Sequence, residues 1–283
     1  MKRLKKLFKC MSRDTHLNLV ILMIITIASG KGGVGKTTVT ANLGVALSKI
    51  GKKVLLVDGD ISMANLGIIF NLEKKKPSLH EVLSGECDVR EAIYRHKTGV
   101  YVLPTSLSIE GYKKSDLDLL PEAILDVADN YDYVLIDAPA GLNRDMAVHL
   151  AVADKVLIVL TPELFSISDG LKIKQSSVMA GTSILGVVLN RTGRDFGEMG
   201  VEEIEMIIEE KVICTIPEDE NIRNATLKRM SVIEYAPKSP SAVAHMELAL
   251  KIVGSYVDIR KIEEAYKGGI LDRIKKLLWR FMR

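Results

Sequence analysis

The sequence is poor in cysteine, and its three cysteines, Cys10, Cys87 and Cys214, lie far apart. No two of them have the Cys-x-x-Cys or Cys-x-Cys spacing of a thiolate site, so a metal or iron–sulfur cluster held within one chain is not expected. A chain with few, unpaired cysteines is typical of a reducing compartment, and we therefore expect a cytoplasmic protein.

Two other features are also scarce. Aromatic residues make up only 5% of the chain, which argues against a stacking surface for single-stranded nucleic acid. No apolar run reaches the length of about 18 residues that a spanning helix needs. The sequence therefore predicts no transmembrane segment.

Positive charge is scarce in the body of the chain. The whole chain carries a formal charge of +3, but residues 1–13 hold six basic and no acidic residues, and residues 270–283 hold five basic and one acidic. The remaining residues therefore carry a net charge of −7. A basic surface for duplex DNA is not visible in the body, so DNA is not an expected partner. The basic ends point instead to an anionic surface.

The N-terminal region resembles a signal peptide, because a basic stretch, residues 1–9, precedes an apolar run, residues 19–28. The apolar run leads directly into a glycine-rich loop, and cleavage there would remove a strand. We therefore expect residues 1–22 to be an extension outside the fold. The apolar residues Leu4, Leu7, Phe8 and Met11 have helical spacing, so a second helix that touches a membrane is the alternative.

Apolar, β-branched runs alternate with helical stretches along the chain. Most of the runs are continuously apolar, as in strands that are covered on both faces. Strands are predicted at residues 24–28, 54–57, 100–103, 133–136, 155–160, 184–189 and 212–216. Helices are predicted at residues 38–50, 79–94, 116–130, 143–152, 166–179, 199–210, 219–229 and 240–264. This alternation predicts an α/β fold with a doubly wound, mostly parallel sheet flanked by helices, in residues 23–265.

Residues 30–38 carry the most specific signal in the chain. They read Gly30-Lys31-Gly32-Gly33-Val34-Gly35-Lys36-Thr37-Thr38 and fit the phosphate-binding pattern G-x-x-x-x-G-K-[ST] between a strand and a helix. The glycines allow backbone N–H groups to point at phosphates, and the helix N-terminus adds positive potential. We expect Lys36 to reach the β- and γ-phosphates of a nucleotide and Thr37 to hold Mg²⁺.

Acidic residues follow two of the predicted strands. Asp58 and Asp60 end one strand and Asp137 ends another, beside the edge of the sheet where ligands bind. Carboxylates at these positions can hold Mg²⁺ directly or through water, and Asp60 and Asp137 are the preferred candidates. Gly141, four residues after Asp137, can bring a backbone N–H to a γ-phosphate.

Three segments together resemble the MinD/ParA group of deviant Walker-A ATPases, and within it MinD-type proteins of archaeal character. They are the loop with Lys31, the stretch Asp58-Gly59-Asp60 with Met63-Ala64-Asn65-Leu66 behind it, and Asp137-Ala138-Pro139-Ala140-Gly141. The resemblance covers about residues 24–260 and the C-terminal tail. It implies a P-loop NTPase fold, ATP and Mg²⁺ as ligands, and an ATP-dependent homodimer that hydrolyses ATP.

The resemblance also implies roles for single residues. Lys31 would reach the nucleotide of the partner subunit, Asp60 would orient the attacking water, and Asp137 would be the Walker-B-type acid. Asn190 and Pro217 match positions that flank adenine. Asp169 matches a position that binds partners, whereas Ala64 and Gly67 differ from the charged residues of bacterial MinD. An activating or effector protein is therefore expected but not identified.

The C-terminal segment, residues 266–283, begins with a glycine hinge and continues as an amphipathic stretch. Its apolar face is predicted to touch a membrane, with basic residues on the other side. The predicted membrane contacts are Ile270, Leu271, Ile274, Leu277, Leu278, Trp279, Phe281 and Met282. A helix docked on the body of the protein or on a partner is the alternative.

These observations predict an ATP-hydrolysing positioning protein of MinD type, cytoplasmic and peripherally associated with the inner face of the cell membrane. It would place or regulate cell-division or other machinery. The main alternative is a ParA-like partition ATPase that acts on DNA or protein cargo. A metal-delivery ATPase is disfavoured by the lack of paired cysteines, and a dinucleotide-dependent oxidoreductase by the lack of a G-x-G-x-x-G motif with its ribose-binding acid.

Overall fold

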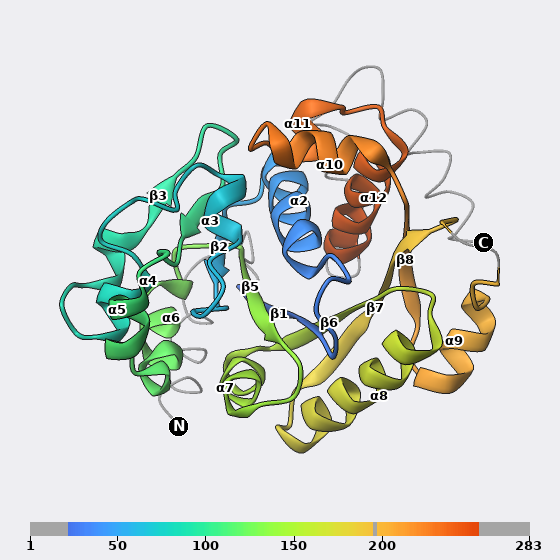
Figure 1. The fold of residues 1–283 in the computed structure, drawn as a ribbon, viewed down its shortest axis with the longest axis horizontal. Coiled ribbons are helices and arrows are strands. Elements are labelled where there is room, and N and C mark those ends of the chain that lie inside the picture. Colours follow the sequence, from blue (N-terminus) through green and yellow to red (C-terminus); the bar gives the residue numbers. More distant parts are fainter. Residues whose placement is uncertain (1–21, 195–196, 255–283) are drawn as a thin grey trace, which may run out of the picture.

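An eight-stranded sheet forms the centre of the structure (Figure 1). The computed structural model describes residues 22–194 and 197–254. All neighbouring strands are parallel except β3 and β4, which are antiparallel. In order across the sheet, the strands are β3 (Tyr94–Arg95), β4 (Tyr101–Leu103), β2 (Val54–Asp58), β5 (Tyr133–Ala140), β1 (Met23–Ser29), β6 (Lys155–Leu160), β7 (Ser183–Thr192) and β8 (Val212–Pro217).

Helices connect the strands and cover both faces of the sheet. The α-helices are α2 (Lys36–Lys49), α3 (Leu66–Ile69), α4 (Leu79–Leu83), α5 (Ile109–Lys114), α6 (Leu120–Ala128), α7 (Arg144–Val152), α8 (Leu164–Met179), α9 (Val201–Ile208), α10 (Glu220–Leu227), α11 (Val232–Tyr235) and α12 (Pro240–Gly254). Two short 3₁₀ helices are η1 (Val89–Ala92) and η2 (Leu117–Leu119). None of the helices in the described part of the chain is long and apolar enough to cross a membrane.

Alternate residues of the central strands pack into different layers. In β1, Ile25 and Ile27 face the core under α2 and α12, whereas Ile24 faces the core under α4 and α6. A third cluster packs β6 against α7, α8 and α9, which lie on the opposite side of the sheet from α2 and α12 (Figure 1). Both faces are therefore buried, which explains the continuous apolar runs of these strands.

The predicted α/β fold with a doubly wound, mostly parallel sheet is confirmed. The predicted helix at 79–94 is wrong: α4 ends at Leu83, and η1 and the antiparallel strand β3 follow. Gly85 has a positive φ of 74° just after the helix, and Asp88 caps the next turn with its side chain. A residue in the left-handed region is a common helix stop, so the break has a local cause.

Several predictions concern residues outside the described ones. The N-terminal extension falls there except for its last residue, Leu22. The C-terminal segment 266–283 and the end of the helix predicted at 240–264 also fall there, since the description of α12 stops at Gly254. The division into an extension, an ATPase domain and a membrane segment stays a prediction.

Candidate functional site

The loop between β1 and α2 has the backbone shape of a phosphate cradle. Gly33 and Gly35 have φ angles of 82° and 91°, values that favour glycine. Gly35 precedes the first residue of α2, and no side chain caps that helix end. The first N–H groups of a helix lack intrahelical partners, so this 14-residue helix offers donors and its positive dipole end to an anion.

Close packing holds the loop in place. A Cβ added to Gly30 would lie 2.5 Å from the backbone oxygen of Asp169 in α8, and one added to Gly35 would lie 2.2 Å from Nδ2 of Asn190. The same Nδ2 donates a hydrogen bond of 2.7 Å to the Val34 carbonyl. The glycines are therefore needed for close approach as well as for their dihedral angles.

Lys36 and Asp137 meet under the loop. Lys36 Nζ lies 3.2 Å from Asp137 Oδ1, and Thr40 Oγ1 lies 3.3 Å from the same oxygen. Both charged side chains are buried, with 9% and 1% of their surface exposed. The second oxygen of Asp137, Oδ2, is buried and has no hydrogen-bond partner in the structure. A buried carboxylate oxygen without a donor is unusual, and a metal-bound water or a cation would satisfy it.

Asp58 lies beside Asp137 at the end of β2, and Asp60, two residues further on, has a different environment. Asp58 is fully buried and accepts hydrogen bonds from the N–H groups of Leu66 and Gly67 through Oδ2. Burial, together with the nearby charge of Asp137, raises the pKa of Asp58 well above its usual range. Asp60 is half-buried, and its Oδ1 accepts from Ser62 and from the N–H of Met63. Asp60 therefore caps its own turn while it faces the cleft described below.

Lys31 and Gly141, two further predicted site residues, lie in different settings. Lys31 is half exposed, and its Nζ lies 3.8 Å from Glu163 Oε2 at the surface. Gly141 has a φ of 87°, and its N–H donates to the Ser29 carbonyl at 3.1 Å. That N–H is engaged in this conformation, so it would have to leave Ser29 to reach a phosphate as predicted.

A cleft of about 510 Å³ opens beside the loop, within the usual size range of small-ligand sites. Its lining comes from the loop, the segment after β2, the end of β5, the end of β7 and α10. The lining residues are Ser29, Lys31, Gly32, Gly33, Val34, Gly35, Lys36, Thr37, Thr38, Asp60, Met63, Asn65, Ile68, Ile69, Ala140, Arg191 and Thr226. Residues 31–38 of the predicted loop and Asp60 are therefore brought together, whereas Gly30 and Gly141 do not line the cleft and Asp137 pairs with Lys36 below it.

The two residues expected to flank adenine do not line this cleft. Asn190 is buried and supports the loop through Val34, and Pro217 lies half-buried at the end of β8. Their contact with adenine stays a prediction. Arg191, which follows Asn190, does line the cleft and has an unusual φ of 61°. Its position at a strand end could have indicated a site residue from the sequence, whereas nothing in the sequence points to Thr226 of α10.

Three features define the class of protein. A glycine-rich loop follows a central parallel strand, the lysine of this loop pairs with a strand-end carboxylate, and the N-terminus of the next helix faces a cleft. The protein is a P-loop nucleotide-binding protein. Comparison with protein families agrees, because the model described as "AAA domain" matches residues 22–177.

Proteins of similar sequence indicate which family of P-loop proteins the chain resembles. An uncharacterized ATP-binding protein of Methanocaldococcus jannaschii is 67% identical over 259 residues, which cover 91% of this chain and 98% of the relative. The septum site-determining protein MinD of Thermotoga maritima is 32% identical over 271 residues, with 92% of this chain and 98% of that protein covered.

Solved structures agree with these relatives. The cell division ATPase MinD of Pyrococcus furiosus is 42% identical, with a TM-score of 0.81 over 83% of this chain and 99% of that one. MinD of Pyrococcus horikoshii, solved with Mg-ADP, is 39% identical with a TM-score of 0.79 over 81% and 95%. MinD in the Aquifex aeolicus MinC:MinD complex is 32% identical, with a TM-score of 0.73 over 83% and 97%. The chain belongs to the MinD/ParA family of P-loop ATPases.

Proposed function

We propose that the protein is an ATP-hydrolysing switch of MinD type. With ATP bound it forms a homodimer, and the dimer associates with the inner face of the cell membrane, where it places or regulates partner machinery. The observation that carries the proposal is the cleft beside the loop, where Lys36 faces the buried carboxylate of Asp137 and the N-terminus of α2 lies open.

The residues present fit Mg²⁺ and a nucleoside triphosphate. Mg²⁺ is commonly held by one or two carboxylates together with substrate phosphates, and the unpartnered Oδ2 of Asp137 is a suitable oxygen. Thr37, Asp60 and Asp137 would hold the ion, and the backbone N–H groups of residues 30–38 would hold the phosphates. The ion would supply neutralisation of the charge that develops on the phosphate oxygens. The Pyrococcus horikoshii relative solved with Mg-ADP supports this pairing.

The protein's own contribution to hydrolysis is positioning and electrostatic stabilisation, because phosphoryl transfer needs little covalent chemistry from the protein. Lys36 binds the β- and γ-phosphates, and Asp60, which faces the cleft, orients the attacking water. Lys31 from the partner subunit stabilises charge on the transferred group, as an arginine finger does in related classes. Hydrolysis therefore depends on the dimer, and we expect it to be slow until a partner protein accelerates it.

Exposed apolar side chains near the cleft support a dimer. Met63 lines the cleft itself, Leu142 follows the end of β5, Leu164 and Phe165 follow Glu163, and Leu227 follows Thr226. Each of the five is well exposed in the single chain, and Phe165 has 75% of its surface exposed. Exposed apolar residues around a polar site are typical of a surface that another chain covers. Lys31 is half exposed and lines the same cleft, which supports its proposed role across such an interface.

The membrane part of the proposal comes from residues 270–283, which lie outside the described residues. Their apolar and basic residues alternate at helical spacing. The partner is not identified. The Aquifex aeolicus relative was solved as a MinC:MinD complex, which supports a protein partner in general, and cell division is one candidate process.

The test is a comparison of nucleotide states in the full chain. Hydrolysis of Mg-ATP is measured as phosphate release, and sedimentation with anionic vesicles is measured with ATP and with ADP. We expect slow but measurable hydrolysis, and more protein on vesicles with ATP. Binding to DNA that requires ATP, with no vesicle binding, would favour a ParA-like role instead.

A further inference from the structure

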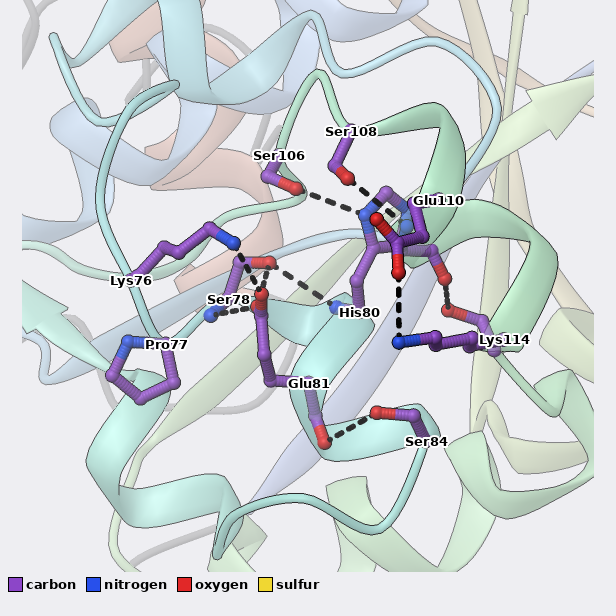
Figure 2. Close-up of polar contacts among 12 residues, drawn as sticks. Lys76, Pro77, Ser78, His80, Glu81, Ser84, Ser106, Ser108, Glu110 and Lys114 are labelled. Atoms are coloured by element: carbon purple, nitrogen blue, oxygen red, sulfur yellow. Dashed lines mark hydrogen bonds and ion pairs between the residues drawn. The ribbon is translucent and has the colours of Figure 1, made fainter.

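His80 of α4 lies buried between two segments that are distant in the sequence. Only 1% of its surface is exposed. Its Nε2 lies 2.9 Å from the carbonyl oxygen of Ile61, and its Nδ1 lies 3.0 Å from Ser106 Oγ. A carbonyl oxygen can only accept, so Nε2 carries the proton and donates it to Ile61. In the neutral ring Nδ1 then accepts from the Ser106 hydroxyl. Figure 2 shows the contact with Ser106.

The Ile61 carbonyl belongs to the segment that carries Asp60. This segment is fastened at two further points: Thr105 Oγ1 donates to the Asp58 carbonyl at 2.7 Å, and Asp58 Oδ2 accepts from Leu66 N–H at 3.2 Å. Ile61 is 8% exposed, whereas Met63, two residues on, is 63% exposed. Thr105 and His80 therefore hold the buried half of the segment from other elements, and the half-buried Asp60 lies between the buried residues Gly59 and Ile61.

The elements that hold His80 are themselves fixed. Ser78 and Glu81 form a reciprocal capping box at the start of α4, and the N–H of Leu79 donates to the Pro104 carbonyl at 2.8 Å (Figure 2 draws the capping box). On another side, a Cβ added to Gly111 of α5 would lie 2.8 Å from Nδ1 of His80. The imidazole is therefore closely packed, and a single hydrogen bond links it to Ile61.

We propose that His80 is a positioning residue for ATP hydrolysis. Its imidazole fixes the Ile61 carbonyl against Ser106 and thereby sets the backbone from which Asp60 reaches the cleft. His80 does not line the cleft and touches none of the loop residues proposed to bind phosphate, so it acts through the position of Asp60 and leaves the phosphate contacts of the loop intact. This inference rests on the proposed hydrolytic function and on the role of Asp60 in it.

Two isosteric substitutions separate the ring nitrogens. The amide nitrogen of glutamine can take the place of Nε2 and donate to Ile61, whereas the shorter asparagine reaches only the position of Nδ1. We expect H80N to lower kcat roughly tenfold or more, because displacement of a catalytic group by about 1 Å is sufficient for such a loss. We expect KM for ATP to stay within about twofold, and H80Q to recover most of kcat.

A second substitution disturbs the ring without changing its chemistry. Gly111→Ala places a methyl group against Nδ1 and the Cβ of His80. It should therefore lower kcat, as H80N does, and leave KM unchanged. The matched control is His96→Gln. His96 is half-buried, contacts the ring of Phe70 edge-on and bonds Thr98, so its loss should leave kcat unchanged.

The series includes D60A, and thermal midpoints are recorded for every variant. A fall in kcat for H80N that H80Q reverses, at equal thermal midpoints, supports the inference. H80N with kcat within twofold of the unaltered protein overturns it, as does a parallel loss of kcat, ATP affinity and thermal midpoint in both variants. If the unaltered protein releases no phosphate, the proposed function fails and the inference with it. If D60A abolishes hydrolysis while H80N does not change it, the inference alone fails.

Discussion

Asp58 and Asp137 are direct partners in the register of β2 and β5, so two carboxylates lie side by side at the centre of the sheet. Both residues are buried, and Lys36 pairs with Asp137. Burial is the largest cause that raises the pKa of Asp58, and the charge of Asp137 adds to it. The two acids therefore have different roles: Asp137 keeps the loop lysine in place, and Asp58 ties Leu66 and Gly67 to the end of β2.

Replacement of Asp58 by asparagine should stabilise the protein at neutral pH without nucleotide. A carboxyl group whose pKa is raised on folding favours the folded state below its unfolded pKa, and this contribution is lost as pH rises. Asparagine keeps the shape and cannot ionise. We expect D58N to be more stable at pH 7, with the difference shrinking as pH falls toward 4. Urea unfolding measures it.

The control for this prediction is D126N, which alters an exposed carboxylate on α6. Its effect should stay within about 0.5 kcal/mol at every pH. A D58N variant that is less stable than the unaltered protein at pH 7 would mean that Asp58 is held by interactions that favour its charged form.

The strands and the loop can be predicted well from the sequence because their signals are local. Continuous β-branched runs are typical of strands buried on both faces, and parallel strands bring their carboxyl ends to one edge. Asp60 and Lys36 are therefore expected near each other on the sequence pattern alone. The contact between Lys36 and Asp137 joins residues 101 positions apart, and only the order of strands decides it.

Other features could not be read from the sequence. The break of the helix predicted at 79–94 depends on Gly85 and on pairing between β3 and β4, which is a tertiary interaction. The buried position of Asn190 against Val34 and the contact of His80 with Ile61 depend on how distant loops pack. Single histidines and asparagines occur in many settings, so their residue type alone does not reveal such contacts.

Lys36→Ala should abolish ATP binding. The substitution removes the cation that we expect to contact the phosphates. It also leaves the buried carboxylate of Asp137 without its ion pair, so we expect a loss of stability of about 3–5 kcal/mol. Calorimetry with Mg-ATP at a temperature where the variant remains folded measures affinity. K49A, which alters an exposed residue at the other end of α2, is the control and should bind normally. Equal ATP affinity in folded K36A would contradict the site assignment.

Lys31 should control dimerisation and not folding. In the D60A background, which is expected to bind ATP without hydrolysing it, the protein should form dimers with ATP, and adding K31A should return it to the monomer. Light scattering gives the mass in each state. Lys31 pairs with Glu163 at the surface of its own chain, so E163Q is a matched control. It frees the lysine and should leave the dimer intact or strengthen it. One mass in every nucleotide state would contradict the ATP-dependent dimer.

For one predicted tail, residues 270–283, the favourable and unfavourable contributions to the free energy of membrane binding are of similar size. Dimerisation should therefore decide whether the protein binds the membrane. Burial of several Leu, Ile and Phe side chains contributes about 1.5–3 kcal/mol each, and each basic residue near an anionic surface adds about 1 kcal/mol. Ordering the segment costs about 1–2 kcal/mol per residue. These contributions nearly cancel for one tail, whereas two tails on one dimer gain roughly 10²–10⁴ in avidity.

Membrane association should therefore require both ATP and residues 270–283. The full chain should sediment with anionic vesicles when ATP is present, less with neutral vesicles, and less at high salt. Truncation after Gly269 should remove sedimentation and leave ATP binding intact, and Leu277→Glu should act nearly the same by placing a charge on the apolar face. If the truncated protein still sediments, the tail is not the anchor, and the basic residues 1–13 become the next segment to delete. If the full chain binds equally with ADP and ATP, the tail anchors the protein but the nucleotide does not control it.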